Sequence, residues 1–101
     1  MKIVINRCFG GFELSEKVLD ILKNRGFDEE EIYNFRFGDF RRDYKEVIQV
    51  IEELGEEANN NSYSKIKVVE IPDDSTDWDI IEYDGSEYVI YVKNGKIEKV
   101  F

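Results

Sequence analysis

Apolar and polar positions follow two different periods along the chain, and the changes of period divide it into elements. The run Lys2–Asn6 is short and rich in β-branched residues, which predicts a strand buried on both faces or nearly so. Gly10-Gly11 ends this run. Apolar residues then recur at helical spacing between Ser15, a good N-cap, and Gly26, which stands where a helix C′ residue belongs. The pattern predicts a first helix over 16–25.

A second, very short helix is indicated just after this glycine. Asp28 with Glu31 three residues later forms a capping box, so the helix begins there and ends near Asn34. The segment 35–42 then alternates Phe and Arg around a glycine, which favours a loop or a short extended piece.

The main helix is predicted over 44–58. Asp43 and Glu46 form another capping box, and the apolar stripe that follows has the i, i+3, i+4 spacing of a helix face. Gly55 inside this stripe costs about 1 kcal/mol relative to Ala. It either lets another backbone approach closely or marks fraying at the helix end.

Beyond an Asn-rich break the period becomes strand-like in four segments, 65–71, 78–83, 87–92 and 96–101. The dipeptides Asp84-Gly85 and Asn94-Gly95 supply the positive φ angles that type I′ turns require, so the last three segments should form an antiparallel meander. The order of one strand, two or three helices and four strands predicts a single α+β domain over residues 1–101. Its meander is expected to pack on the main helix.

The chain is strongly acidic, with 23 acidic and 14 basic side chains and a formal net charge of −9. This charge repels nucleic-acid phosphates and anionic membranes, so neither is expected as a direct partner. A protein with a basic surface fits better, because spaced carboxylates can imitate the phosphates of a nucleic acid. The alternative is that the acidity only keeps the protein soluble. The partner-binding residues in the first hypothesis are Asp28, Glu29, Glu30, Glu52, Glu53, Glu56, Asp73, Asp74 and Asp77.

Few residues are suited to catalysis. The chain contains no histidine, which removes Ser-His-Asp catalysis and most transition-metal sites. Cys8 is the only cysteine, so it forms no intramolecular disulfide. The four Asp residues of segment 73–79 resemble an EF-hand only vaguely, because Trp78 stands where such a loop needs glycine. We therefore expect no enzyme activity, no metal and no cofactor.

A second hypothesis places a small ligand or nucleotide at the loop containing Gly10 and Gly11. This loop joins a buried strand to a helix that begins after Ser15, where backbone amides can hold an anion, and Arg41 or Arg42 could close over it. The glycine spacing matches neither the dinucleotide fingerprint nor the P-loop. The alternative is a tight turn between strand and helix.

Several runs resemble a family of small uncharacterised phage and prophage proteins. The opening Met1-Lys2-Ile3-Val4-Ile5-Asn6, followed by Cys8-Phe9-Gly10-Gly11-Phe12 and Leu14-Ser15, is the most specific match. Further matches are Glu52-Glu53-Leu54-Gly55, the run 67–73, Trp78 with Ile80, and Glu82-Tyr83-Asp84-Gly85 with Glu87. The family has a proline after its Arg-Asp step, where this chain has Tyr44. The resemblance implies a viral or mobile-element origin and no catalytic activity.

Together these features favour a host-directed binding protein in the cytoplasm of the host cell. We expect an inhibitor of a bacterial defence system, of the anti-CRISPR kind, that occludes a basic nucleic-acid-binding surface on a host protein. The cytoplasmic location is expected because no stretch approaches the about 18 apolar residues of a membrane span, and the first apolar run is shorter than that of a signal peptide. The alternatives are a ligand-binding, sponge-like protein and an oligomeric phage accessory protein that pairs through an exposed strand edge.

Overall fold

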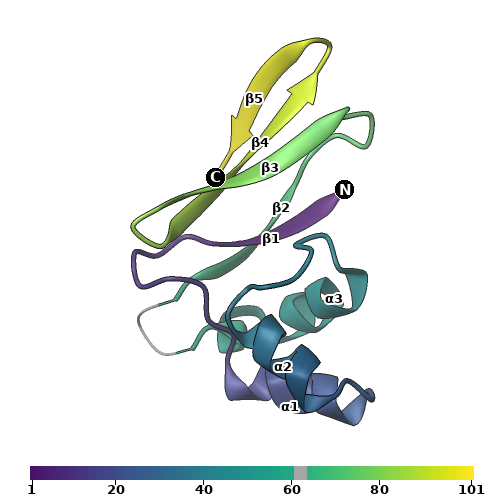
Figure 1. The fold of residues 1–101 in the computed structure, drawn as a ribbon, viewed down its shortest axis with the longest axis vertical. Helices are drawn as coiled ribbons and strands as arrows, with labels where there is room; N and C mark the ends of the chain where they lie inside the picture. The colour runs from purple at the N-terminus through teal and green to yellow at the C-terminus, as the bar shows by residue number, and fades with distance from the viewer. Residues whose placement is uncertain (61–63) are drawn as a thin grey trace.

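The computed structural model describes residues 1–60 and 64–101, which form three layers stacked along the long axis (Figure 1). Helices lie at one end, a pair of strands crosses the middle, and a three-stranded antiparallel sheet lies at the other end. The predicted α+β class and the predicted order of elements are confirmed. In chain order the elements are β1 (Lys2–Asn6), α1 (Glu16–Asn24), α2 (Glu29–Arg36), α3 (Lys45–Leu54), the 3₁₀ turn η1 (Gly55–Ala58), β2 (Ile66–Glu70), β3 (Asp77–Tyr83), β4 (Ser86–Lys93) and β5 (Lys96–Val100).

The middle layer is the antiparallel pair of β1 and β2, in which Val4 lies opposite Val68. Successive side chains of a strand point to opposite faces, so β1 contributes to two cores. Val4 packs among the helices, whereas Ile3 and Ile5 pack with residues of the meander, and all three are fully buried. The prediction of a strand buried on both faces is confirmed.

The helix layer confirms one predicted capping box and corrects the other. Asp28 Oδ1 accepts the N–H of Glu31 at 2.8 Å, and Glu31 Oε1 accepts the N–H of Asp28 at 3.1 Å. The prediction of a box at Asp43 is wrong: the N-cap of α3 is Tyr44, which makes no side-chain capping bond. Asp43 instead accepts two hydrogen bonds from Arg41, at 3.0 and 3.1 Å, so its carboxylate is turned away from the helix.

The main helix is shorter than predicted because Gly55 adopts φ +60°. The α-helix ends at Leu54, and the chain continues as η1 to the fully buried Ala58. Nothing lies within 4 Å of where a Cβ on Gly55 would be, so this glycine marks the helix end and does not serve a close backbone approach.

The predicted meander is formed by β3, β4 and β5, with Asp84 and Asn94 at φ 51° and 52° in its two turns. Its inner face, centred on the fully buried Val89, packs on the β1–β2 pair. The other face of this pair is covered by α3 (Figure 1). One detail therefore differs from the prediction: the β1–β2 pair lies between the meander and the main helix, because a strand buried on both faces needs a layer on each side.

Within the described residues, no helix combines the length and the apolar character needed to cross a membrane.

Candidate functional site

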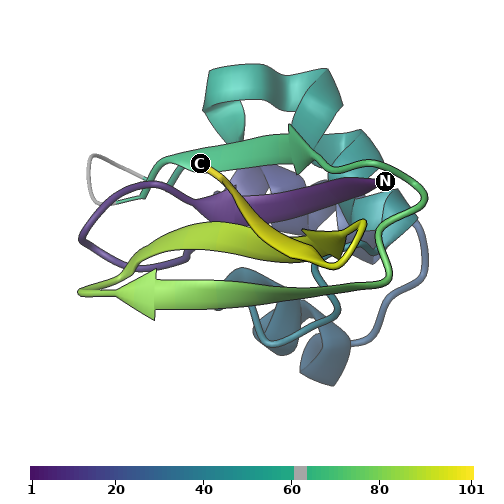
Figure 2. The ribbon, with the colours of Figure 1, turned by 90° about the horizontal axis from the view of Figure 1, so that it is seen from above.

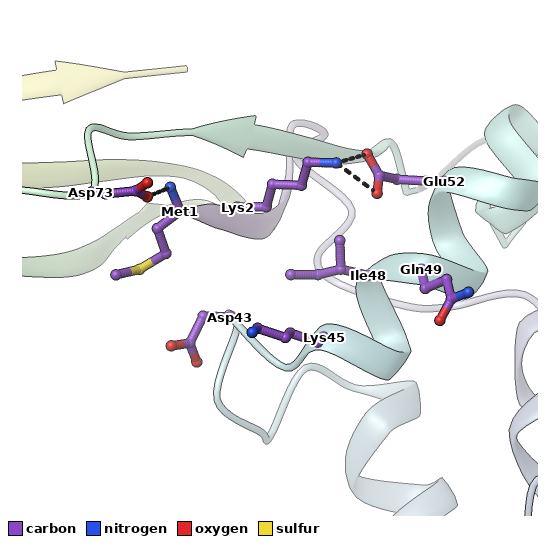
Figure 3. Close-up of a pocket in the computed structure, with 8 residues that line it drawn as sticks. All are labelled: Met1, Lys2, Asp43, Lys45, Ile48, Gln49, Glu52 and Asp73. Atoms are coloured by element: carbon purple, nitrogen blue, oxygen red, sulfur yellow. Dashed lines mark hydrogen bonds and ion pairs between the residues drawn. The ribbon is translucent and has the colours of Figure 1, made fainter.

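A charged cleft lies between the start of β1 and the exposed side of α3 (Figure 3). Its volume is about 520 Å³. The ammonium of Lys2 bonds both carboxylate oxygens of Glu52, at 2.9 and 3.1 Å, and the amino group of Met1 pairs with Asp73. The lining residues are Met1, Lys2, Asp43, Lys45, Ile48, Gln49, Glu52 and Asp73.

Opposite charges balance each other in this cleft. Glu52 accepts a hydrogen bond from Lys2 and adds its negative charge, which together raise the pKa of the Lys2 ammonium. The amino group of Met1 lowers the pKa of the Asp73 carboxyl in the same way, through a hydrogen bond and its positive charge. Both groups therefore stay ionised near neutral pH, and the cleft presents paired charges to a ligand.

The nine carboxylates predicted to contact a partner lie in separate parts of the fold. The structure brings Glu52 and Asp73 together at the cleft, although they lie on α3 and in the loop after β2. The remaining seven do not line this cleft. They are Asp28, Glu29 and Glu30 at the start of α2, Glu53 on α3, Glu56 in η1, Asp74 in the loop after β2, and Asp77 at the start of β3.

Four of these nine carboxylates have a cationic partner, since Glu53 lies 3.8 Å from Arg25 and Asp74 lies 3.9 Å from Lys93, in addition to the two pairs of the cleft. Two others hold backbone amides: Asp28 caps α2, and Asp77 Oδ1 accepts the N–H of the next residue at 2.9 Å. In the part of the chain that the structure describes, three of the nine carboxylates have neither an ion-pair partner nor a backbone hydrogen bond. They are Glu29, Glu30 and Glu56.

The loop containing Gly10 and Gly11 packs against the β3–β4 turn. A Cβ added to Gly85 would lie 2.5 Å from the Phe9 carbonyl oxygen and 2.6 Å from the Gly11 nitrogen. The fully buried Asn6 holds both segments, because its Nδ2 donates to the carbonyls of Cys8 at 2.7 Å and Gly85 at 2.9 Å. The protein's own turn thus occupies the approach to this loop.

Ser15 serves as the predicted N-cap of α1. Its hydroxyl accepts the N–H of Val18 at 3.4 Å and donates to the carbonyl of Glu57 at 2.6 Å. The first turn also carries Glu16, which pairs with Arg36. An anion at this helix end would face a carboxylate, as the sequence indicates. Binding of a ligand by Gly10, Gly11 and Ser15 stays a prediction.

Arg41 and Arg42 have different environments. Arg41 is exposed and pairs with Asp43. The side chain of Arg42 is only 11% exposed and bonds both carboxylate oxygens of Glu87, itself 8% exposed, at 2.8 and 2.9 Å. Its guanidinium carbon lies 4.2 Å from the centre of the Phe12 ring. Arg42 is therefore held by internal contacts and is not free to close over a ligand.

Sequence reasoning missed the buried network around Glu87. Besides Arg42, the carboxylate accepts the backbone N–H of Asn6 at 2.8 Å, and the backbone carbonyl of Glu87 accepts a bond from Arg7 at 2.7 Å. One signal was available: Glu87 shares the inward face of β4 with Val89 and Tyr91, where alternation calls for an apolar residue. A charged residue there needs a buried partner of opposite charge.

No protein-family model matches this chain, and no curated protein or solved structure shows significant similarity to it. Its function is therefore inferred from geometry and charge. Within residues 1–60 and 64–101, no three potential metal ligands are grouped closely enough to hold an ion.

Proposed function

We propose that this protein acts by binding a host protein that has a basic surface, and that it thereby inhibits a bacterial defence nuclease of the CRISPR type. The observation that carries the proposal is the excess of unpaired negative charge: the formal net charge is −9, and Glu29, Glu30 and Glu56 have no cationic partner in the part of the chain that the structure describes. Carboxylates of this kind are available to a partner at little cost, because no internal ion pair has to break.

The mechanism is occlusion. Carboxylates on the helix ends compete with nucleic acid for Lys and Arg side chains of the partner, and no bond of either molecule is broken. Such binding is steered by long-range attraction, so association is fast at low salt and weakens as salt screens the charges. The lack of histidine and the single cysteine are compatible with this mechanism because it needs neither.

The test is capture of a host nuclease from a bacterial lysate by the immobilised protein, followed by a defined competition assay. The captured protein is identified, purified and loaded with fluorescent nucleic acid, and release of the nucleic acid by the acidic protein is measured. We expect displacement whose affinity falls at least about tenfold between about 50 and 500 mM salt. Binding that is indifferent to salt would reject the electrostatic mechanism.

Two charge-matched variants locate the surface. The variant Glu29→Gln/Glu30→Gln/Glu56→Gln removes three unpaired carboxylates from the helix layer. The control Glu82→Gln/Asp84→Asn/Glu98→Gln removes the same charge from the meander. We expect the first to weaken displacement at least about tenfold more than the control, because close contacts outweigh net charge. Equal losses would show that only net charge matters.

A further inference from the structure

The outer edges of β1 and β3 have backbone donors that internal contacts already occupy. The outward N–H of Val4 in β1 donates to the Arg42 carbonyl at 2.8 Å, and that of Asn6 donates to Glu87 Oε1 at 2.8 Å. On β3 the N–H groups of Trp78 and Ile80 donate to the preceding Asp carboxylates, at 2.9 and 2.8 Å. These contacts occupy the donors that an incoming strand would need.

The outer edge of β2 differs. Arg7 N–H donates to the Lys65 carbonyl and Ile71 N–H donates to the Met1 carbonyl. The backbone N–H and C=O groups of the odd-numbered residues of β2 therefore point toward β1, and those of the even-numbered residues point away from it. Asn59 Oδ1 accepts the N–H of Ile66 at 2.6 Å. Within the described residues the outward N–H groups of Val68 and Glu70 have no acceptor. Figure 2 shows β2 as the outer strand, with β1 on its inner side.

A groove of about 340 Å³ runs along this edge, between β2 and the end of the helix layer. Its apolar part contains the buried Ile51 and the half-buried Ile66 and Val68. Glu52 and Glu56 line the groove from the helix side, and Lys65 and Lys67 line it from the strand. An edge with free donors beside an apolar groove is the arrangement that accepts an added strand.

We propose that the open edge of β2 binds an extended basic segment of the partner protein as an additional strand. Alternation places Glu70 on the helix side of β2 together with Val68, so this side presents the carboxylates of Glu56 and Glu70 to the incoming strand, beside Glu52, which Lys2 already pairs. The segment that fits has Lys or Arg at every second position, toward the helices, and small polar residues between them. The proposal rests on the proposed function in that both require a basic partner.

The open edge of β5 is less suitable for the same partner. It carries Lys96 and Lys99, as the edge of β2 carries Lys65 and Lys67, so the lysines do not distinguish the two edges; the edge of β2 has in addition the carboxylate of Glu56 beside it, on the helix side of the groove.

The test uses a capped peptide of about eight residues that alternates Lys and Thr, titrated into the ¹⁵N-labelled protein. We expect the amide resonances of Val68 and Glu70 to shift and their hydrogen exchange to slow at least about tenfold at saturation, because a new hydrogen bond protects each amide. A peptide with the same charges and an N-methyl group on every residue, which blocks the amides facing β2 in either strand direction, serves as the control, and it is expected to bind at least about fivefold more weakly.

Two variants separate the contribution of the Glu70 backbone N–H to peptide binding from that of the Glu70 carboxylate. Glu70→Gln removes the carboxylate and keeps the N–H, whereas Glu70→Pro removes both without touching the β1–β2 hydrogen bonds. We expect Glu70→Pro to bind the peptide at least about fivefold more weakly than Glu70→Gln. Thermal unfolding verifies that each variant is folded, and the N-methylated peptide provides the same comparison without any change to the protein.

Equal binding by the two variants, or shifts confined to α2 or the meander, would overturn strand addition at β2. A lack of binding by the peptide would do so as well. Nuclease displacement by the unmodified protein would still support the proposed function in each of these cases. Protection of the Val68 amide that grows with protein concentration and without peptide would assign the edge to a second copy, which also overturns the proposal.

Discussion

Replacing Glu87 with leucine tests how the three layers are joined. The carboxylate links β4 to the segment before α3 through Arg42, and to β1 through the N–H of Asn6. Leucine has a similar volume and no acceptor, so the substitution leaves a buried guanidinium and a buried amide without this partner. The expected result is a less stable protein with the same fold.

The magnitude follows from the contacts that remain. Removing one member of a buried ion pair costs about 3 to 5 kcal/mol. Arg42 keeps its bond to the Gly38 carbonyl at 2.9 Å and its position over the Phe12 ring, which places the cost near the lower end. The amide of Asn6 adds about 1 kcal/mol as an unsatisfied buried donor. The sum of about 4 kcal/mol is a large share of the about 5 to 15 kcal/mol that stabilise a domain.

Urea unfolding, followed by the fluorescence of Trp78 and by circular dichroism, measures the free energy of unfolding. Glu87→Gln keeps an acceptor and is expected to cost about half as much as Glu87→Leu. The double variant Arg42→Met/Glu87→Leu leaves no buried charge and is expected to be at least about 1 kcal/mol more stable than Glu87→Leu alone.

A loss below about 1 kcal/mol for Glu87→Leu would equal that of a surface ion pair and would refute this reasoning. A double variant less stable than the single one would refute it too, since the buried cation would then not be the source of the cost.

Three further predictions concern local features. Gly95→Ala is expected to lower the free energy of unfolding by about 1 kcal/mol because Gly95 has a positive φ. Gly85→Ala is expected to lower it by about 2 kcal/mol more, because the new methyl group also meets the backbone of the loop before α1. Urea unfolding of the two variants measures the difference. Asp28→Ala is expected to lose about 1 kcal/mol with its capping bonds, whereas Asp43→Ala loses less than about 0.5 kcal/mol because it caps nothing, which thermal unfolding can check. The arginine that pairs with Glu16 lowers the pKa of this carboxyl from its ordinary 4.5, first through a hydrogen bond, so NMR titration should find it below that value. The stability that this ion pair contributes is then present above pH 4.5 and is lost as pH falls through the lowered pKa of Glu16.

Local features of the candidate surfaces were predictable in part. The acidic residues at the start of α2 and the end of α3 lie on helices as expected, because capping and apolar periodicity act within a few residues. The ion pair with Lys2 neutralises the carboxylate of Glu52. This pair joins residues that are 50 positions apart in the sequence. No local rule predicts such a contact.

The sequence by itself determined the elements and the two hairpin turns, since Asp84-Gly85 and Asn94-Gly95 select their backbone angles through their own side chains. Only the tertiary structure decided that β1 pairs with β2, that Arg42 and Glu87 meet in the interior, and that the outer edge of β2 stays open. The reason is physical: a turn or a cap is a contact between near neighbours, whereas strand partners and buried ion pairs depend on how all layers pack at once.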